Sequence, residues 1–154
     1  MQPMKRIIQL LLLLVFTCGT CFGQQTIGPT SREIADFAFE LSIYPADRRA
    51  EMMAAHPERL TVALRRELIA LGNVRFTASE YTKALDIYQL TEKISEQIGD
   101  KEGVATARLN IGSVYFFQGK YELAIDHYRK GETLFLSLIT ATARPKPIAI
   151  ICIT

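Results

Sequence analysis

The chain has 154 residues, which favours a single domain, and its formal net charge is only +2. No basic run is longer than two residues, so the sequence lacks the electrostatic footprint of a nucleic-acid-binding protein, and we expect no nucleic-acid partner. The short pairs Arg48-Arg49 and Arg65-Arg66 are expected on solvated helix faces. The two His and three Cys have no metal-ligand spacing, so we predict no metal site and no cofactor.

Residues 1–23 have the three parts of a secretory signal peptide: basic Lys5-Arg6, a short apolar run over 10–16 and small residues up to Gly23. Cleavage there would leave Gln24 first and a neutral chain exported to the periplasm or the extracellular space. Two alternatives stay open. Residues 7–22 could be a membrane anchor, although the run is shorter than the roughly 20 residues of a span. A lipoprotein would instead carry its lipid on Cys18 or Cys21.

After a leader over 24–30, the chain predicts two helices. Thr30 and Glu33 form a capping-box pattern, and apolar residues at helical spacing follow, which predicts a helix over 31–43. A shorter helix is expected over 46–55, before Pro57. These two segments do not share the pattern of the later helices, so residues 31–56 are expected to form a helical cap over the rest of the fold.

Four longer helices are predicted next. The first starts at Pro57 or Glu58 and continues to about Thr77, with Leu60, Leu64, Leu68 and Leu71 on its buried side. Ser79 is expected to open the second, which reaches about Ile98. Asp100 is expected to cap the third, over 101–118, and the fourth covers 120–140. Residues 141–154 then form an irregular apolar tail.

One pattern occurs twice in these helices, 40 residues apart. Leu71-Gly72 returns as Ile111-Gly112, and three further residues return together: Tyr81, Ala84 and Tyr88 as Tyr121, Ala124 and Tyr128. Glycine inside a helix costs roughly 1 kcal/mol relative to alanine, and close helix approach is the usual compensation. The copies over 57–98 and 99–140 are therefore expected to be antiparallel helix pairs that stack on each other. Tyr121, Ile125 and Tyr128 are expected to pack inward.

This repeat resembles the tetratricopeptide pattern, which places Leu-Gly before an aromatic residue and then Ala and an aromatic residue four apart. Arg75 and Arg108 stand where that pattern has an aromatic and a large apolar residue. The period of 40 also exceeds the usual 34, and the extra residues are expected in the connection 97–101. The resemblance implies an all-α fold of antiparallel helix pairs stacked as a short right-handed solenoid. Longer periods of this kind look like the N-terminal repeat regions of exported bacterial proteins.

The resemblance also implies a non-catalytic protein interaction module, because the first helices of successive repeats line a concave groove that receives a peptide or partner helix. Asn73 and Asn110 resemble asparagines that hold a peptide backbone in chaperone-binding members. Ile69 replaces a lysine that clamps a terminal carboxylate there, which argues against that ligand class. The groove residues carried over by motif are Arg66, Ile69, Asn73, Phe76, Thr77, Thr106, Leu109, Asn110, Ser113, Phe116 and Phe117.

No catalytic set stands out. His127 follows Asp126, but adjacent helix residues do not face each other, so His127 is expected on the exposed outer face. Glu92 and Glu96 share one helix face and are expected to form a solvated acidic stripe. The chain is therefore interpreted as non-enzymatic. The alternative is the sensory or regulatory front of a longer enzyme, such as a histidine kinase or a caspase-like protease. Phe135, Leu138 and Ile139 extend the apolar pattern, which predicts self-association through the C-terminal end.

Overall fold

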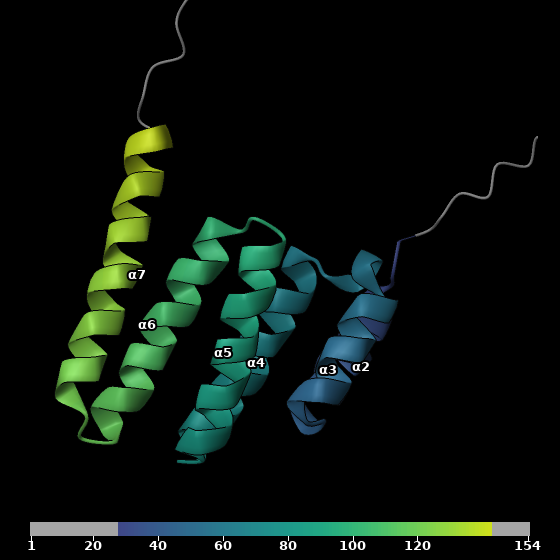
Figure 1. Ribbon diagram of the computed structural model, residues 1–154, viewed down its shortest axis with the longest axis horizontal. Coiled ribbons are helices and arrows are strands. Elements are labelled where there is room, and N and C mark those ends of the chain that lie inside the picture. The colour runs from purple at the N-terminus through teal and green to yellow at the C-terminus, as the bar shows by residue number, and fades with distance from the viewer. Residues whose placement is uncertain (1–27, 143–154) are drawn as a thin grey trace, which may run out of the picture.

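The computed structural model describes residues 28–142, and this part of the chain is helical without strands. Figure 1 shows the helices side by side as antiparallel neighbours, from α2 and α3 at one end to α7 at the other. The expected signal peptide or anchor, most of the leader and nearly all of the tail lie outside the described residues. The elements in order are α2 (Ser31–Ile43), α3 (Ala46–Ala55), the 3₁₀ turn η2 (Pro57–Arg59), α4 (Val62–Thr77), α5 (Tyr81–Gln97), α6 (Lys101–Phe117) and α7 (Tyr121–Thr142).

The bounds predicted for α2 and α3 are confirmed, and the capping box is present at the start of α2. The Glu33 amide donates to Thr30 Oγ1 at 3.3 Å, and the Thr30 amide donates to Glu33 Oε2 at 2.7 Å. Two backbone N–H groups that the helix cannot satisfy internally are thus paired. Tyr44 then leaves the helical region, as expected for a residue before Pro45.

The prediction that one helix runs from Pro57 or Glu58 to Thr77 is wrong at its start. Pro57–Arg59 forms a 3₁₀ turn, and α4 begins only at Val62. The cause is a second cap: Thr61 is extended, and its hydroxyl accepts from the Leu64 amide at 3.3 Å. Leu60 therefore lies before the helix, partly buried, whereas Leu64 and Leu68 are fully buried on α4.

The connections after α4, α5 and α6 are alike, with three residues each and a positive φ at the central one: Ser79 (60°), Gly99 (71°) and Gly119 (73°). In each, the third residue donates its amide back across the turn, as Glu80 does to the Arg75 carbonyl at 2.9 Å, which is the Schellman pattern. Ser79 therefore ends the turn of α4 instead of opening α5, so that prediction is wrong. The predicted cap of α6 is confirmed, because Asp100 Oδ1 accepts from the Gly103 amide at 2.9 Å.

The long period of the repeat comes from the helices, so the prediction of extra residues in the 97–101 connection is wrong. The α5–α6 connection is as short as the other two, while α5 and α6 each have 17 residues. Longer helices keep the stacking pattern and extend the contact between neighbours. The two copies thus differ from 34-residue repeats in helix length and not in loop length.

The core consists of two clusters. In the first, α2 and α3 pack on α4 and α5, with Phe37, Leu41, Leu68 and Ile94 almost completely buried. In the second, Ala84 and Tyr88 of α5 pack against Ile111 and Val114 of α6. The two repeat glycines lie at such contacts. A Cβ added to Gly72 would come within 2.8 Å of Tyr88 Cδ1, and one on Gly112 within 2.8 Å of Tyr128 Cδ1.

The expectation that both arginine pairs lie on solvated faces is wrong for one member of each pair. Arg49 and Arg65 are buried, and each forms an ion pair with an acidic residue from a later element. Arg49 of α3 pairs with Asp86 of α5, and Arg65 Nε lies 3.0 Å from Asp100 Oδ2. Only the neighbouring Arg48 and Arg66 stay exposed. Consecutive helix residues point about 100° apart, so one member of each pair faces the interior.

Helix α7 packs on α6 through the side that carries Ala124 and Gly131, which are both buried. Tyr128 lies over Gly112, as expected. The expectation that Tyr121 and Ile125 pack inward is wrong, since Tyr121 is 55% exposed and Ile125 is 49% exposed. They lie on a side of α7 that α6 leaves largely exposed, and the described residues provide no further helix to cover it.

Candidate partner-binding surface

Four of the predicted groove residues meet between the first helices of the two repeats. Asn73 and Phe76 of α4 and Asn110 and Ser113 of α6 line a hollow of about 120 Å³, together with Tyr88 of α5. The 40-residue repeat explains this meeting, because it places equivalent turns of α4 and α6 beside each other. The hollow offers two side-chain amides and two hydroxyls beside two aromatic rings, which suits a peptide backbone with an apolar side chain.

The polar groups of this hollow are partly occupied by the fold itself. The Tyr88 hydroxyl donates to Asn73 Oδ1 at 2.6 Å, and burial raises the pKa of Tyr88 to about 12, so the phenol stays a donor. In the second copy the Tyr128 hydroxyl donates to Ser113 Oγ at 3.1 Å. Asn73 keeps its amide nitrogen for a ligand. Asn110 lines the hollow, is half-exposed and forms no side-chain hydrogen bond within residues 28–142, so its amide is available to a ligand.

Aromatic residues continue the surface from Phe76 toward the α6–α7 turn. The Phe117 ring contacts Phe76 edge-on at 5.2 Å between centroids and stacks on Tyr81 at 6.0 Å with an interplanar angle of 23°. Phe117 remains 58% exposed in spite of these contacts. Phe116 extends the series, since it lies 5.8 Å from Phe117 and 5.5 Å from Tyr121. Exposed aromatic rings supply large contact areas for protein partners.

The other predicted groove residues lie outside this hollow. Arg66 and Thr77 are exposed, and Ile69 is half-buried on α4. The Thr106 hydroxyl donates to its own helix at the Glu102 carbonyl, 2.8 Å away. Leu109 serves packing, because it fills the space beside Gly131, where an added Cβ would lie 2.9 Å from Leu109 Cδ2.

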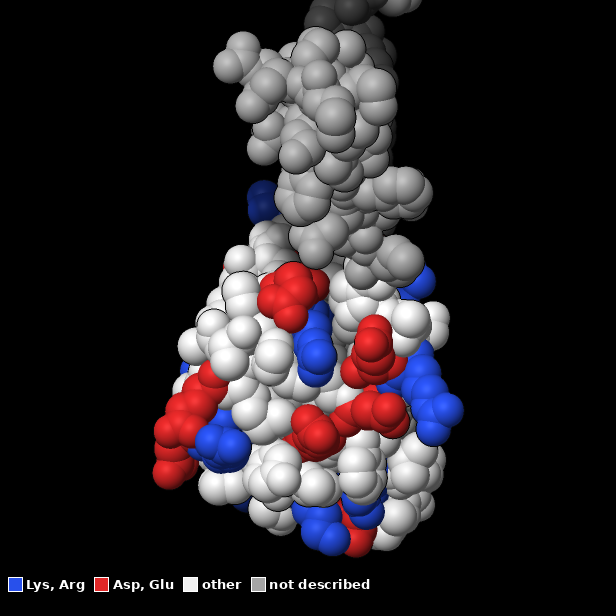
Figure 2. Space-filling view, turned by 90° about the vertical axis from the view of Figure 1, so that its right-hand side faces the viewer, with Lys and Arg blue, Asp and Glu red and all other residues white. Residues whose placement is uncertain are grey.

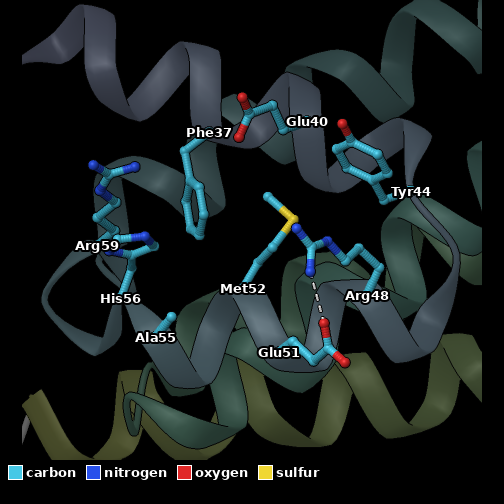
Figure 3. Close-up of a pocket in the computed structure, with 9 residues that line it drawn as sticks. All are labelled: Phe37, Glu40, Tyr44, Arg48, Glu51, Met52, Ala55, His56 and Arg59. Carbon is cyan, nitrogen blue, oxygen red and sulfur yellow. Dashed lines mark hydrogen bonds and ion pairs between the residues drawn. The ribbon is translucent and has the colours of Figure 1, made fainter.

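A larger hollow, of about 370 Å³, lies between α2, α3 and η2 and was not predicted. Figure 3 shows Phe37 and Met52 facing each other across it, with charged side chains around its rim. Two arginines on the rim have interaction partners. Arg48 Nη1 forms an ion pair with Glu51 Oε2 at 2.8 Å, and the Arg59 guanidinium lies over the Phe37 ring, 5.2 Å from its centroid. His56 also contacts the Phe37 ring edge-on. The sequence of residues 46–59 mixes polar and apolar residues without a pattern from which this hollow could be predicted.

The charged residues beside α6 form a network, so the prediction of a solvated acidic stripe is wrong. Arg108 Nε lies 2.6 Å from Glu92 Oε1, and Arg108 Nη2 lies 3.5 Å from Glu96 Oε1. The departure from the repeat pattern at Arg108 thus has a structural role across the α5–α6 contact. On the α2–α3 end, Figure 2 shows acidic and basic side chains interspersed, without a field of one sign.

His127 is half-buried instead of exposed on the outer face. Its ring lies 5.4 Å from the Tyr115 ring, and its Nδ1 is buried without a hydrogen-bond partner in the described structure. Burial is the main cause that lowers the pKa of His127, and Glu92 and Asp126 oppose it. The prediction failed because α7 turns this position toward α6.

Within residues 28–142, no group of three or more His, Cys, Asp or Glu side chains could hold a metal ion. No helix in the same range is long and apolar enough to span a membrane.

The comparison with protein families finds one match, to the family described as tetratricopeptide repeat, over residues 64–137. Among curated proteins and among solved structures, the comparison finds no match to the chain. The matched region covers most of α4 to α7, which are the helices that carry the 40-residue pattern. The sequence match and the stacked antiparallel helix pairs together support assignment of this region to the tetratricopeptide repeat family, with an all-α TPR-like fold.

Proposed function

We propose that the protein is a non-catalytic interaction module that binds a peptide or a partner helix along the face made by α4 and α6. Tetratricopeptide repeats generally mediate protein–protein interaction, which gives the class of partner. The observation that carries the proposal is the hollow lined by Asn73, Phe76, Asn110 and Ser113. It joins equivalent positions of two successive repeats, so one extended ligand could follow both.

The chemistry of this surface favours a particular kind of ligand. Asn110 supplies a donor and an acceptor, as a peptide group needs, and the exposed Phe117 ring supplies apolar contact next to Phe76. Arg66 is exposed on the same helix as Asn73 and adds one positive charge. The lysine of carboxylate-clamping repeats is replaced by Ile69, which favours an internal peptide segment over a free C-terminus.

A peptide-display selection against the full chain tests the proposal. Selected peptides are measured by calorimetry against the wild type and the double variant Asn110→Ala with Phe117→Ala. We expect affinity to fall at least about tenfold, the effect of losing roughly 1.4 kcal/mol of contact. The matched control is Thr82→Ala with Gln89→Ala on the exposed side of α5, which should bind like the wild type. Equal binding by both double variants would place the ligand elsewhere and reject the groove.

We also propose that the protein is exported, with residues 1–23 as a cleaved signal peptide. The support is the order of basic, apolar and small residues ending at Gly23. Mass spectrometry of the protein from cell fractions should find an N-terminus at Gln24 in the exported fraction. An intact Met1 in the soluble cytoplasmic fraction would contradict export, and a lipid on Cys18 or Cys21 would support the lipoprotein alternative.

A further inference from the structure

A second exposed surface lies on α7, where it meets the aromatic end of the α4–α6 groove at Phe116 and Tyr121. We propose that Tyr121, Ile125 and Glu132, here called the α7 face, bind one amphipathic helix of a partner protein. That helix carries an arginine, then aliphatic residues, then an aromatic residue, in the order and spacing found in α6. The contact between α5 and α6 in the same molecule is the template for this proposal.

In that template, α5 presents three kinds of group to α6. At one end, Tyr81 stacks on the Phe117 ring. In the middle, Leu85 packs against the cluster that contains Ile111 and Val114. At the other end, the Glu92 carboxylate accepts a hydrogen bond from Arg108 Nε at 2.6 Å. The helix that recognises α5 therefore reads Arg108, Ile111, Val114 and Phe117, each three residues after the last.

Helix α7 repeats all three groups 40 residues later. Tyr121, Ile125 and Glu132 stand where α5 has Tyr81, Leu85 and Glu92. Both helices also bury the alanine that precedes this aliphatic residue, since Ala84 and Ala124 are each almost completely buried. The side of α7 that corresponds to the α6-contacting side of α5 is therefore left largely exposed, apart from the contact of Tyr121 with Phe116.

The solvent exposure and ion pairing of these residues differ between the two helices. Tyr81 and Leu85 are half-buried by α6, while Tyr121 and Ile125 are about half-exposed. Glu132 is exposed and has no ion pair with any other described residue. Phe116 lies beside Tyr121 at 5.5 Å and widens the aromatic end of the face. A partner helix in the orientation of α6 would place its arginine at Glu132 and its aromatic residue at Tyr121. Its aliphatic residues would then cover the apolar area between them.

A second copy of this chain fits the face less well than a different protein. The α6 pattern of any copy is already covered by its own α5. Helix α4 is covered by α2, and α2 turns Ile34, Phe37 and Leu41 toward α4 in the same cluster. No described helix of a second copy therefore has the required residues free. We therefore take the partner to be a helix from another protein, with the chemistry of α6.

The test uses a labelled peptide with the sequence of residues 101–117 and the change Thr106→Lys, held helical by a lactam bridge between the side chains at positions 102 and 106. Its binding to the full-length protein is followed by fluorescence anisotropy. We expect Ile125→Asp and Glu132→Arg each to weaken binding at least about tenfold. A peptide with Arg108→Glu should bind the Glu132→Arg protein better than it binds the wild type, because the charge pair is restored in reverse.

Two controls carry the same chemical changes to other exposed positions of α7. Leu123→Asp matches Ile125→Asp, and Glu122→Arg matches Glu132→Arg; both should bind the peptide like the wild type. Asn110→Ala alone should leave peptide binding unchanged, which distinguishes this surface from the groove. Absence of binding, or equal effects of test and control variants, would overturn the proposal. Self-association of the protein that Ile125→Asp abolishes, without peptide binding, would assign the face to a second copy and also overturn it.

Discussion

The ring of Tyr88 occupies the space that a side chain at position 72 would need. A Cβ added to Gly72 would lie 2.8 Å from Tyr88 Cδ1, and the Tyr88 hydroxyl is anchored on the adjacent Asn73 at 2.6 Å. The second repeat has the same arrangement, with Tyr128 over Gly112 and its hydroxyl on Ser113. In each repeat, one glycine–tyrosine pair thus sets how closely the two helices approach. The tyrosine ring cannot turn aside without losing its hydrogen bond.

Replacement of Gly112 by leucine should destabilise the fold by roughly 1–3 kcal/mol or more, because overpacking a close helix contact forces the Tyr128 ring or the helix to move. The better helix propensity of leucine offsets less than about 1 kcal/mol of this. Urea unfolding followed by circular dichroism gives the change in free energy. Thr82→Leu on exposed α5 is the matched control and should have little effect. An unchanged unfolding midpoint for Gly112→Leu would refute the packing role.

The three Schellman turns differ at one position, and the difference predicts a stabilising change. Ser79 holds φ at 60°, where Gly99 and Gly119 have 71° and 73°. A left-handed conformation costs a residue other than glycine roughly 1–2 kcal/mol. Ser79→Gly should therefore stabilise the protein by up to about 1 kcal/mol, after the greater entropy of glycine in the unfolded chain is counted. The reverse change Gly119→Ser should destabilise it by a similar amount, measured in the same urea titration.

The Asp100 carboxylate makes two interactions, and two substitutions distinguish their contributions to stability. One carboxylate oxygen caps α6 through the Gly103 amide, and the other pairs with buried Arg65 at 3.0 Å. Asp100→Ala removes both and leaves a buried cation unpaired, which typically costs about 3–5 kcal/mol. Asp100→Asn keeps a capping acceptor, so it should cost less than Asp100→Ala. Equal losses for the two variants would mean that the side-chain cap contributes nothing.

His127 should make the protein less stable at mildly acidic pH. Burial lowers the pKa of His127 below 6.5, so the unfolded chain binds this proton more tightly than the folded chain does. Stability is therefore full above pH 6.5 and falls as the pH drops through 6.5 toward the folded-state pKa. The urea midpoint of the wild type should decrease between pH 7.5 and 5.5, and His127→Gln should show a smaller decrease. A proton NMR titration that finds the His127 pKa above 6.5 would contradict this.

Much of the fold could be predicted because its signals are local or repeated. The Thr30 and Glu33 capping box acts over one helical turn, and Asp100 caps α6 in the same way. The 40-residue return of Gly72 and Tyr88 as Gly112 and Tyr128 identified the helix pairs, since stacking of equal units is the simplest way to bury a repeated apolar stripe. The resemblance to the tetratricopeptide pattern indicated which faces of α4 and α6 meet around Asn73 and Asn110.

What the sequence alone determined is therefore the number, order and pairing of the repeat helices, because each of these rests on short-range caps and on a periodic pattern. The tertiary structure decided which neighbours each side chain has. Arg49 and Arg65 are buried only because Asp86 and Asp100 come from distant segments to neutralise them, and no local pattern specifies that. Tyr81 and Tyr121 are the same residue in the same pattern, yet one stacks on Phe117 and the other is exposed. Burial depends on the helix that packs next, and that is a property of the assembled fold.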